Sequence, residues 1–420
     1  FYTRLLINKD RRMAMKKIIM FKKILVLLIC LASLISASAC GKQQVNEGRL
    51  DELVVDLPDN FFIGFDASEV KSVDSAKVYK AVSLEFDADE VAKKLLKREI
   101  VSTKVYAQGP WFETGDNELK EYLTVYDGGK SCGVDSGVVG GLNYSMYVNG
   151  ESLRAKLSKL ISNEPGPPDS IAQEWGYNLK SDYASFADLS FMSYKDALAE
   201  VKKLLCDTLG FPELEVAEAY SMDLETMLEH YELYLESWSH FGGDKEEITL
   251  TKDDECYVFF FRQVIDDIPV INVIWQGGRL ANSAAGDSDS AIRIAAGNPM
   301  PCTSISVCYD RNGVRRIHAY GLYKIVESRE DKPLVSAAKA LQVVIDDYSE
   351  ILLESETIVE SMELYYVGIP SADGYQLIPA WVFCIAKANK WSSPADGRVT
   401  PVYSYEYYVV DAITGEKLSS

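Results

Sequence analysis

The sequence predicts an α+β fold made of antiparallel sheets, with helices packed on one face, in two or three modules. The chain has 420 residues, and the 381 that follow the expected export segment correspond to two or three domains. Many of its 25 tyrosines stand in alternating runs, which are typical of strands. After residue 171, a helix pattern followed by several strand-like runs occurs twice. That order favours helices on one face of each antiparallel sheet.

Two capped helices open the two copies of this pattern. The first is expected over Tyr194–Leu209, where Ser193 and Asp196 form a capping-box-like start and Gly210 ends the helix. The second begins after Ser336, a candidate N-cap residue. Two further helices are expected at Asp89–Lys97 (with Asp87 as its N-cap) and Leu224–Trp238.

The strands are expected in hairpins. Asp310-Arg311-Asn312-Gly313 is predicted to be a hairpin turn, because glycine occupies the position that needs a positive φ. Asp266-Asp267 is predicted to be the turn between two other strands. The strand-like runs are Leu119–Tyr126, Leu142–Val148, Leu214–Tyr220, Cys256–Val264, Pro269–Gln276, Ser304–Tyr309, Val314–Tyr323, Met362–Gly368, Ile378–Ala386 and Tyr403–Val410.

A proline-rich segment marks the clearest internal boundary. Three prolines and a glycine between Asn163 and Asp169 can continue neither a helix nor a central strand. The predicted division is an upstream extension and signal peptide (1–39), a flexible tether (40–56), an N-terminal α+β domain (57–162), the linker (163–170), a module with an acidic helical insertion (171–300) and a second such module (301–420).

The first forty residues carry an export signal. Four lysines between Lys16 and Lys23 precede an apolar run, Ile24–Ile35, of signal-peptide length, and small residues then lead to Cys40. This arrangement resembles the lipobox of bacterial lipoproteins. The resemblance implies that the Cys40 sulfur carries a diacylglyceryl group and that the signal is cut just before it. The expected location is therefore the extracytoplasmic face of the cell membrane. The residues before Met13 are interpreted as an upstream extension of the reading frame.

An ordinary secretory signal is the alternative. Ala37 stands where the lipobox usually has leucine or another larger aliphatic residue, and Ala37-Ser38-Ala39 also fits a soluble-export cleavage site. The polar segment after Cys40 favours the lipoprotein, because it is suited to hold a folded domain away from a lipid surface.

Charge and cysteine content exclude some classes of protein. The expected mature chain has 35 basic and 62 acidic side chains, a net charge near −27, which disfavours nucleic-acid binding. Six cysteines follow Cys40 without a C-x-x-C spacing, so their disulfide state stays open. Cys206 and Cys384 fall in apolar patterns and are interpreted as small buried side chains.

No catalytic or metal-binding pattern is present in the sequence. His230, His240 and His318 fit no metalloprotease spacing, and no nucleophile lies in a recognisable motif. The acidic runs Asp253-Asp254-Glu255 and Asp266-Asp267 are more simply explained as turns than as Ca²⁺ ligands. We therefore expect no catalytic residue, no cofactor and no metal site.

The C-terminal half resembles a known family. The helix that opens with Ser and Ala, the later strands and the ending Tyr407–Glu416 are similar to PepSY-like modules of secreted and membrane-anchored bacterial proteins. Phe261–Val270 resembles the related "R…dgiPV" strand pair, with Asp267 in place of the usual glycine, and Leu377–Phe383 resembles the "iPaW" strand of extracytoplasmic regulators of sensor kinases. The combination is similar to uncharacterised clostridial lipoproteins. The resemblance implies inhibition or regulation of an envelope protein and no shared catalytic residues.

The leading hypothesis is a non-enzymatic lipoprotein that binds or regulates an envelope protein. Tyr405 and Tyr407 alternate along a strand and are the candidate partner surface. Two alternatives remain open: an envelope hydrolase that uses two carboxylates about 5–9.5 Å apart, and a solute-binding lipoprotein with two similar α/β lobes. The oligomeric state is open.

Overall fold

The structure is a computed structural model, and the chain divides into two compact units, residues 1–46 and 47–420. It describes residue 50 and residues 57–96, 102–107, 118–125, 130–135, 141–148, 151–152, 183–239, 249–272, 291–293, 299–301, 303–392 and 399–418. The predicted signal peptide and the proline-rich linker lie outside these residues, as does the predicted tether apart from Leu50.

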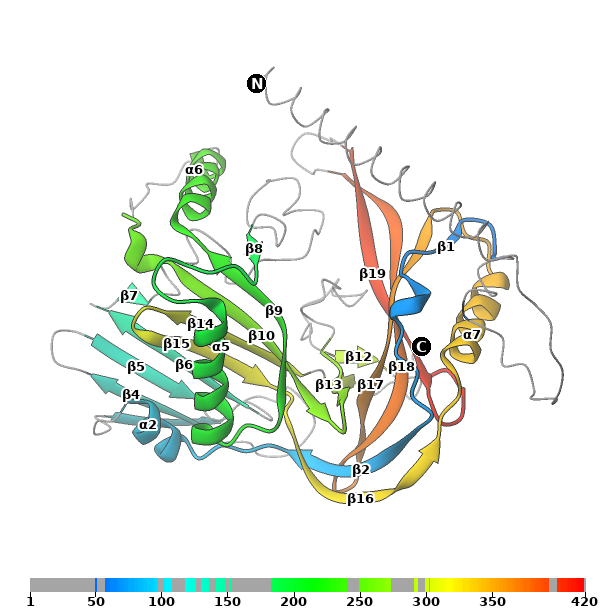
Figure 1. Ribbon diagram of the computed structural model, residues 1–420, viewed down its shortest axis with the longest axis horizontal. Coiled ribbons are helices and arrows are strands. Elements are labelled where there is room, and N and C mark those ends of the chain that lie inside the picture. Colours follow the sequence, from blue (N-terminus) through cyan, green and yellow to red (C-terminus); the bar gives the residue numbers. More distant parts are fainter. Residues whose placement is uncertain are drawn as a thin grey trace. The chain divides into compact units, whose positions relative to one another are not determined.

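Two large sheets and a small hairpin make up the second unit (Figure 1). The six-stranded sheet has the order β1-β17-β18-β2-β16, with β19 also paired to β18, and the eleven-stranded sheet has the order β3-β4-β5-β6-β15-β14-β10-β9-β8, with β7 on β6 and β11 on β10. The strands of the six-stranded sheet are β1 (Phe61–Ile63), β2 (Ser75–Ser83), β16 (Tyr323–Pro333), β17 (Thr357–Ser371), β18 (Gly374–Ser392) and β19 (Val399–Asp411). Those of the eleven-stranded sheet are β3 (Ser102–Ala107), β4 (Glu118–Val125), β5 (Lys130–Asp135), β6 (Leu142–Val148), β7 (Glu151–Ser152), β8 (Ala184–Ser185), β9 (Leu214–Met222), β10 (Cys256–Ile265), β11 (Ile268–Pro269), β14 (Ser304–Asp310) and β15 (Gly313–Tyr320). The small hairpin is β12 (Ala291–Arg293) with β13 (Pro299–Pro301).

The helices are fewer than the strands. They are α2 (Ala88–Leu96), α5 (Tyr194–Lys202), which continues as a π-helix over Lys203–Leu209, α6 (Leu224–Ser239), α7 (Ala337–Ser349) and two short 3₁₀ turns, Ala67–Glu69 and Lys252–Asp254. The chain is therefore mostly β. The prediction of antiparallel sheets is confirmed, apart from the parallel pair β1–β17, but the α+β label gave the helices too much weight.

The helix starts follow the sequence closely. The Ser193 hydroxyl accepts a hydrogen bond from the Asp196 amide at 3.2 Å, and Gly210 ends the π-helix with φ +83°. Ser336 accepts from the Lys339 amide, also at 3.2 Å. Local hydrogen bonds that neighbouring residues can make thus determine where these helices begin and end.

One arrangement occurs three times. A helix is followed by strands that pair with their sequence neighbours, as α2 with β3–β6, α5 with β9, β10, β14 and β15, and α7 with β17–β19. The α2 unit and the α5 unit, each a helix with its strands, join through their last strands, because β6 and β15 pair antiparallel. The helices α2 and α5 pack on one face of the resulting sheet (Figure 1). Gly141 permits this junction, since a Cβ there would lie 1.8 Å from the carbonyl oxygen of Ala319.

The two sheets do not follow the predicted modules, because strands of one module pair into both sheets. The predicted N-terminal domain (57–162) gives β2 to one sheet and β3–β6 to the other, and the last module (301–420) is divided in the same way. Pairing between strands distant in sequence depends on register and buried faces that no local pattern encodes. The eleven-stranded sheet therefore has strands from all three predicted modules, and the six-stranded sheet has strands from the first and the last.

β10 connects the two sheets. The Gln263 amide exchanges two hydrogen bonds of 2.9 Å with the backbone of Tyr323 at the start of β16. Arg262 binds Glu215 on β9 at 3.1 Å and Glu363 on β17 at 2.9 Å. Beyond β11, Val270 forms a parallel bridge with Tyr366 on β17. These contacts hold the β10–β11 turn against the six-stranded sheet.

No helix among the described residues is long and apolar enough to cross a membrane.

Candidate functional site: a groove beside the β10–β11 turn

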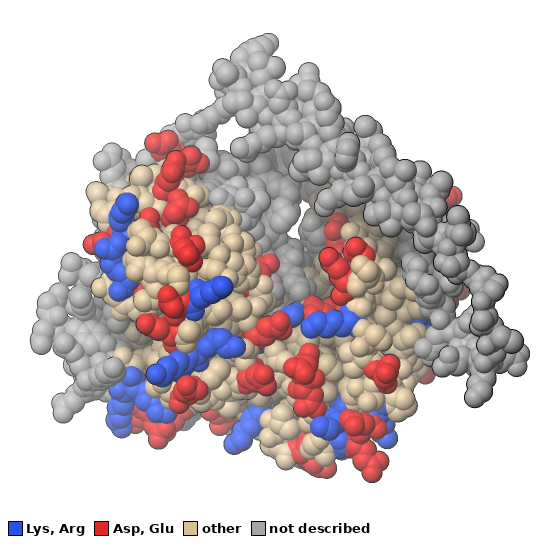
Figure 2. Space-filling model, in the orientation of Figure 1, with Lys and Arg blue, Asp and Glu red and all other residues tan. Residues whose placement is uncertain are grey.

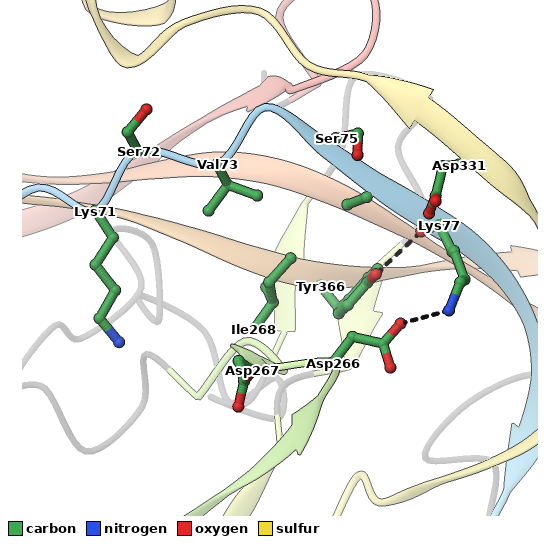
Figure 3. A pocket seen from close by; sticks show the side chains of 11 residues that line it. Lys71, Ser72, Val73, Ser75, Lys77, Asp266, Asp267, Ile268, Asp331 and Tyr366 are labelled. Atoms are coloured by element: carbon green, nitrogen blue, oxygen red, sulfur yellow. Dashed lines mark hydrogen bonds and ion pairs between the residues drawn. The ribbon is translucent and has the colours of Figure 1, made fainter.

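An open groove of about 500 Å³ lies between the β10–β11 turn and the segment that leads into β2 (Figure 3). One wall is the extended chain from Lys71 to Lys77, and the other is the turn Asp266–Ile268. Tyr366 lies between them and donates a 3.1 Å hydrogen bond from its hydroxyl to the Lys77 carbonyl. The complete lining is Lys71, Ser72, Val73, Ser75, Ala76, Lys77, Asp266, Asp267, Ile268, Asp331 and Tyr366.

Both turn residues have left-handed backbones. Asp266 has φ +47° and Asp267 has φ +62°, as a two-residue hairpin turn of this kind requires. Glycine or asparagine is usual in such turns, and aspartate tolerates the conformation at a cost. The predicted turn is confirmed. Asp267 therefore keeps a carboxylate where the resembling motif has glycine, and strain of this kind is often associated with function.

Asp266 is anchored by two donors. The Tyr79 hydroxyl donates a short hydrogen bond to its Oδ2 atom, and Lys77 Nζ lies 3.1 Å from the same atom. The Tyr79 hydrogen bond, with help from Lys77, holds the pKa of Asp266 below its ordinary value. The hydrogen bond that Lys77 itself donates to Asp266 raises the pKa of Lys77. Asp266 thus stays ionised and positions the turn.

Two other charges of opposite sign face the groove without an ion pair. Among the described residues, neither Lys71 nor Asp267 has a charged partner within 4.0 Å. Figure 3 shows both side chains extending toward the same side of the groove, with Ser72 next to Lys71 in the wall above. Within the described part of the chain, the groove consequently presents a cation and a carboxylate that have no ion-pair partner, with the Ser75 hydroxyl in the same wall as Lys71. Figure 2 shows acidic and basic side chains interspersed over the visible face around it.

The groove is poorly suited to acid–base hydrolysis. A glycosidase-like pair needs one carboxyl group whose pKa is raised, so that it can donate a proton. Asp266 has the opposite property, since its pKa is lowered by Tyr79 and Lys77. Among the described residues, no group of three or more His, Cys, Asp or Glu side chains is placed to hold a metal ion.

The predicted partner surface on β19 is wrong for Tyr407. This side chain is 8% exposed and packs with Tyr365, Cys384 and Val409, because every second residue of β19 faces that apolar cluster. The side chain of Tyr405 lies outside the described residues. Tyr403 on the same strand is 41% exposed and donates a 2.9 Å hydrogen bond to Glu356.

Other predicted residues have structural roles or lie outside the described part. Cys40 and His240 are not described, and neither is the side chain of His230. Asp254 completes a capping box with Thr251, in agreement with the turn interpretation of that acidic run. His318 is half-buried and contacts the Tyr320 ring, with centroids 5.2 Å apart.

Only one wall of the groove could be anticipated. The turn Asp266–Asp267 was visible as a polar interruption between apolar strands, whereas Lys71, Lys77 and Tyr79 carried no motif. Their sequence distance from the turn, nearly 190 residues, leaves no local signal of contact.

Comparison with known proteins shows a shared fold and no family. No family model matches the chain, and no curated protein does so significantly. A similar fold occurs in the crystal structure of an uncharacterized protein from Eubacterium rectale ATCC 33656. The two share 17% sequence identity, the match covers 85% of this chain and 88% of that one, and the TM-score is 0.50. The similarity establishes the arrangement of strands and leaves the activity to the chain's own residues.

Proposed function

We propose that this protein is a membrane-tethered extracytoplasmic lipoprotein that binds or regulates an envelope protein without catalysis. The groove beside the β10–β11 turn supports binding, because it is open and presents Lys71 and Asp267, which have no ion-pair partner among the residues that the structure describes. The lipobox-like sequence ending in Cys40 supports the location. In this proposal the acyl anchor places the domain at the membrane, and the groove engages the partner.

A polypeptide segment is the ligand that suits the groove best. Its walls offer a cation, a carboxylate and the hydroxyl of Ser75, which match the charged side chains and backbone groups of an extended peptide. Ile268 and Val73 add apolar surface between the polar groups. Such a mixed surface is typical of the polar rim and small apolar centre of a protein–protein contact.

The finer fold assignment belongs to the same proposal. In this proposal the α5 and α7 units, each a helix packed on one face of a largely antiparallel sheet, are the counterparts of the two expected PepSY-like modules, although the α5 unit extends beyond the predicted boundary at residue 300. The α2 unit is a third arrangement of the same kind; the sequence predicted its helix and strands but not their likeness to the other two. Modules of this type without catalytic residues support regulation by contact.

The binding proposal is tested by capturing a partner from solubilised membranes with a C-terminally tagged chain. Asp267→Asn removes the free charge and keeps a side chain that tolerates the turn, so it should reduce the captured partner about tenfold, equivalent to roughly 1.4 kcal/mol. Asp59→Asn, an exposed carboxylate outside the groove, is the matched control and should leave capture unchanged. Equal capture by both variants contradicts a role for the groove.

The anchor is tested separately. Cys40→Ala should release the chain into the medium or leave the precursor unprocessed, as followed by fractionation and mass. Unchanged processing and membrane association would show that Cys40 is not lipidated.

Two rival functions have their own outcomes. Turnover of a cell-wall substrate by the purified protein, with no captured protein, would favour the envelope hydrolase. The solute-binding lipoprotein predicts saturable binding of a small molecule. It has less support, because the two sheets are unlike each other and largely antiparallel.

A further inference from the structure

Two cysteines meet in the eleven-stranded sheet. Cys256 opens β10 and Cys308 lies in the neighbouring strand β14. In the antiparallel register Cys256 stands opposite Asp310 and Val258 stands opposite Cys308. The two cysteines are therefore diagonal neighbours on one face of the sheet. Both have 0% exposure and belong to the same apolar cluster beneath α6.

Both thiols point into the same buried cluster. Each is a free thiol, and the sulfur of Met222 lies 3.8 Å from that of Cys256. Diagonal neighbours lie near the upper limit of the separation that a disulfide spans, so the bridge needs a small approach of β10 and β14. Cys206 and Cys384 provide a contrast, since neither contacts another cysteine among the described residues.

We propose that Cys256 and Cys308 form a disulfide when the chain folds outside the membrane. This inference rests on the export that the proposed function includes, because exported proteins meet oxidising conditions that cytosolic proteins do not. The reaction is thiol–disulfide exchange with a disulfide-bearing oxidant. The two cysteine S–H bonds and the S–S bond of the oxidant break, and the Cys256–Cys308 S–S bond forms. The oxidant takes up the two electrons and the two protons that the cysteines lose, and so becomes two thiols.

The bond forms before the strands close over it. In the folded chain, hydrogen bonding to Cys308 and burial raise the pKa of the Cys256 thiol well above its ordinary value, so little thiolate is present to react. Once formed, the buried disulfide is shielded from reductants in the native state.

The cross-link encloses the candidate site. The loop between Cys256 and Cys308 contains the β10–β11 turn with Asp266 and Asp267. A bond between β10 and β14 therefore cross-links the two ends of the chain segment that includes one wall of the groove. The disulfide lowers the conformational entropy of the unfolded chain and holds the two ends of this segment together in the folded chain.

Differential labelling of the full-length protein taken from envelopes tests the proposal. The protein is acid-quenched, denatured and treated with iodoacetamide, then reduced and treated with N-ethylmaleimide, and its peptides are weighed. Cys256 and Cys308 should carry the second label, whereas Cys206 and Cys384 should carry the first. The Cys308→Ala variant should move Cys256 to the first label, and Cys384→Ala should change neither cysteine of the pair.

The outcomes separate this inference from the proposed function. If Cys256 and Cys308 both carry iodoacetamide in a chain whose signal has been removed, the disulfide is absent although the chain is exported, and the inference is overturned. Pairing of either residue with Cys132 or Cys302 would also overturn it. An unprocessed chain retained in the cytoplasm would overturn export, and with it the basis of the disulfide.

Discussion

Replacing Arg262 by alanine removes a guanidinium group that links three strands in two sheets. Its side chain is 13% exposed, and it binds Glu215 on β9 at 3.1 Å and Glu363 on β17 at 2.9 Å. Glu363 also accepts a 2.7 Å hydrogen bond from the Tyr365 hydroxyl. Because β9 and β17 belong to different sheets, the guanidinium joins the sheets next to the turn that forms the groove.

The magnitude follows from burial. Breaking a fully buried ion pair costs about 3–5 kcal/mol, and exposed pairs contribute about 0–1 kcal/mol. Glu363 is 35% exposed and keeps its bond from Tyr365, which lessens the loss, whereas Glu215 is 48% exposed and returns to solvent. We expect Arg262→Ala to lower the free energy of unfolding by about 2–3 kcal/mol, between those limits.

Chemical denaturation followed by intrinsic fluorescence measures this loss. A double-mutant cycle with Glu363→Gln should give a coupling free energy of about 1–2 kcal/mol, since the two groups are in direct contact. Lys80→Ala is the matched control: its pair with Asp373 at 3.2 Å is exposed, so we expect a change below about 0.5 kcal/mol. If Arg262→Ala changes stability no more than this control does, the proposed link between the sheets carries no energy and the reasoning is refuted.

Three further predictions concern the backbone and the groove. Asp267→Gly should raise the free energy of unfolding by about 0.5–1 kcal/mol, because glycine adopts φ +62° without strain, and a loss of stability in denaturation would contradict this. Gly141→Ala should destabilise the chain by more than about 2 kcal/mol or prevent folding, since the new Cβ would lie 1.8 Å from the Ala319 oxygen; a circular dichroism melt unchanged from wild type would exclude the close approach. Because the pKa of Asp266 is lowered in the folded chain, this carboxylate stabilises the fold at pH values above its ordinary pKa of 3.8. That stability is lost as the pH falls through the lower pKa of the folded state, and Tyr79→Phe should weaken this pH dependence in acid titrations. Parallel titration curves for wild type and Tyr79→Phe would show that the hydrogen bond does not set that pKa.

The tyrosines have a role that their pattern did not reveal. In this acidic chain, phenol hydroxyls donate to carboxylates, as between Tyr408 and Asp347 at 2.5 Å and between Tyr365 and Glu363 at 2.7 Å. Each of these carboxylates also pairs with a cation, Asp347 with Lys417 and Glu363 with Arg262. Burial, followed by the hydrogen bond to Asp347, raises the pKa of Tyr408, so its proton stays in place. The sequence predicted strands from these tyrosines, but only their neighbours across the fold show what their hydroxyls bind.

Local features could be predicted from the sequence because a few adjacent residues determine them. The N-caps at Ser193 and Ser336, the left-handed end at Gly210 and the hairpin at Asp310–Gly313 depend on hydrogen bonds and dihedral preferences within about four residues. The alternation that marked the strands likewise depends on each strand's own two faces.

Tertiary structure alone decided which strands meet. The pairing of β6 with β15 and of β2 with β16 joins segments from different predicted modules, because buried apolar faces and steric fit select partners that sequence distance conceals. The groove arises from the same choice, since it exists only where Lys77 and Tyr79 meet Asp266. The sequence by itself determined the signal-like start, the helix ends and the turns, whereas the folded chain decided the sheet order, the burial of Tyr407 and the groove beside the β10–β11 turn.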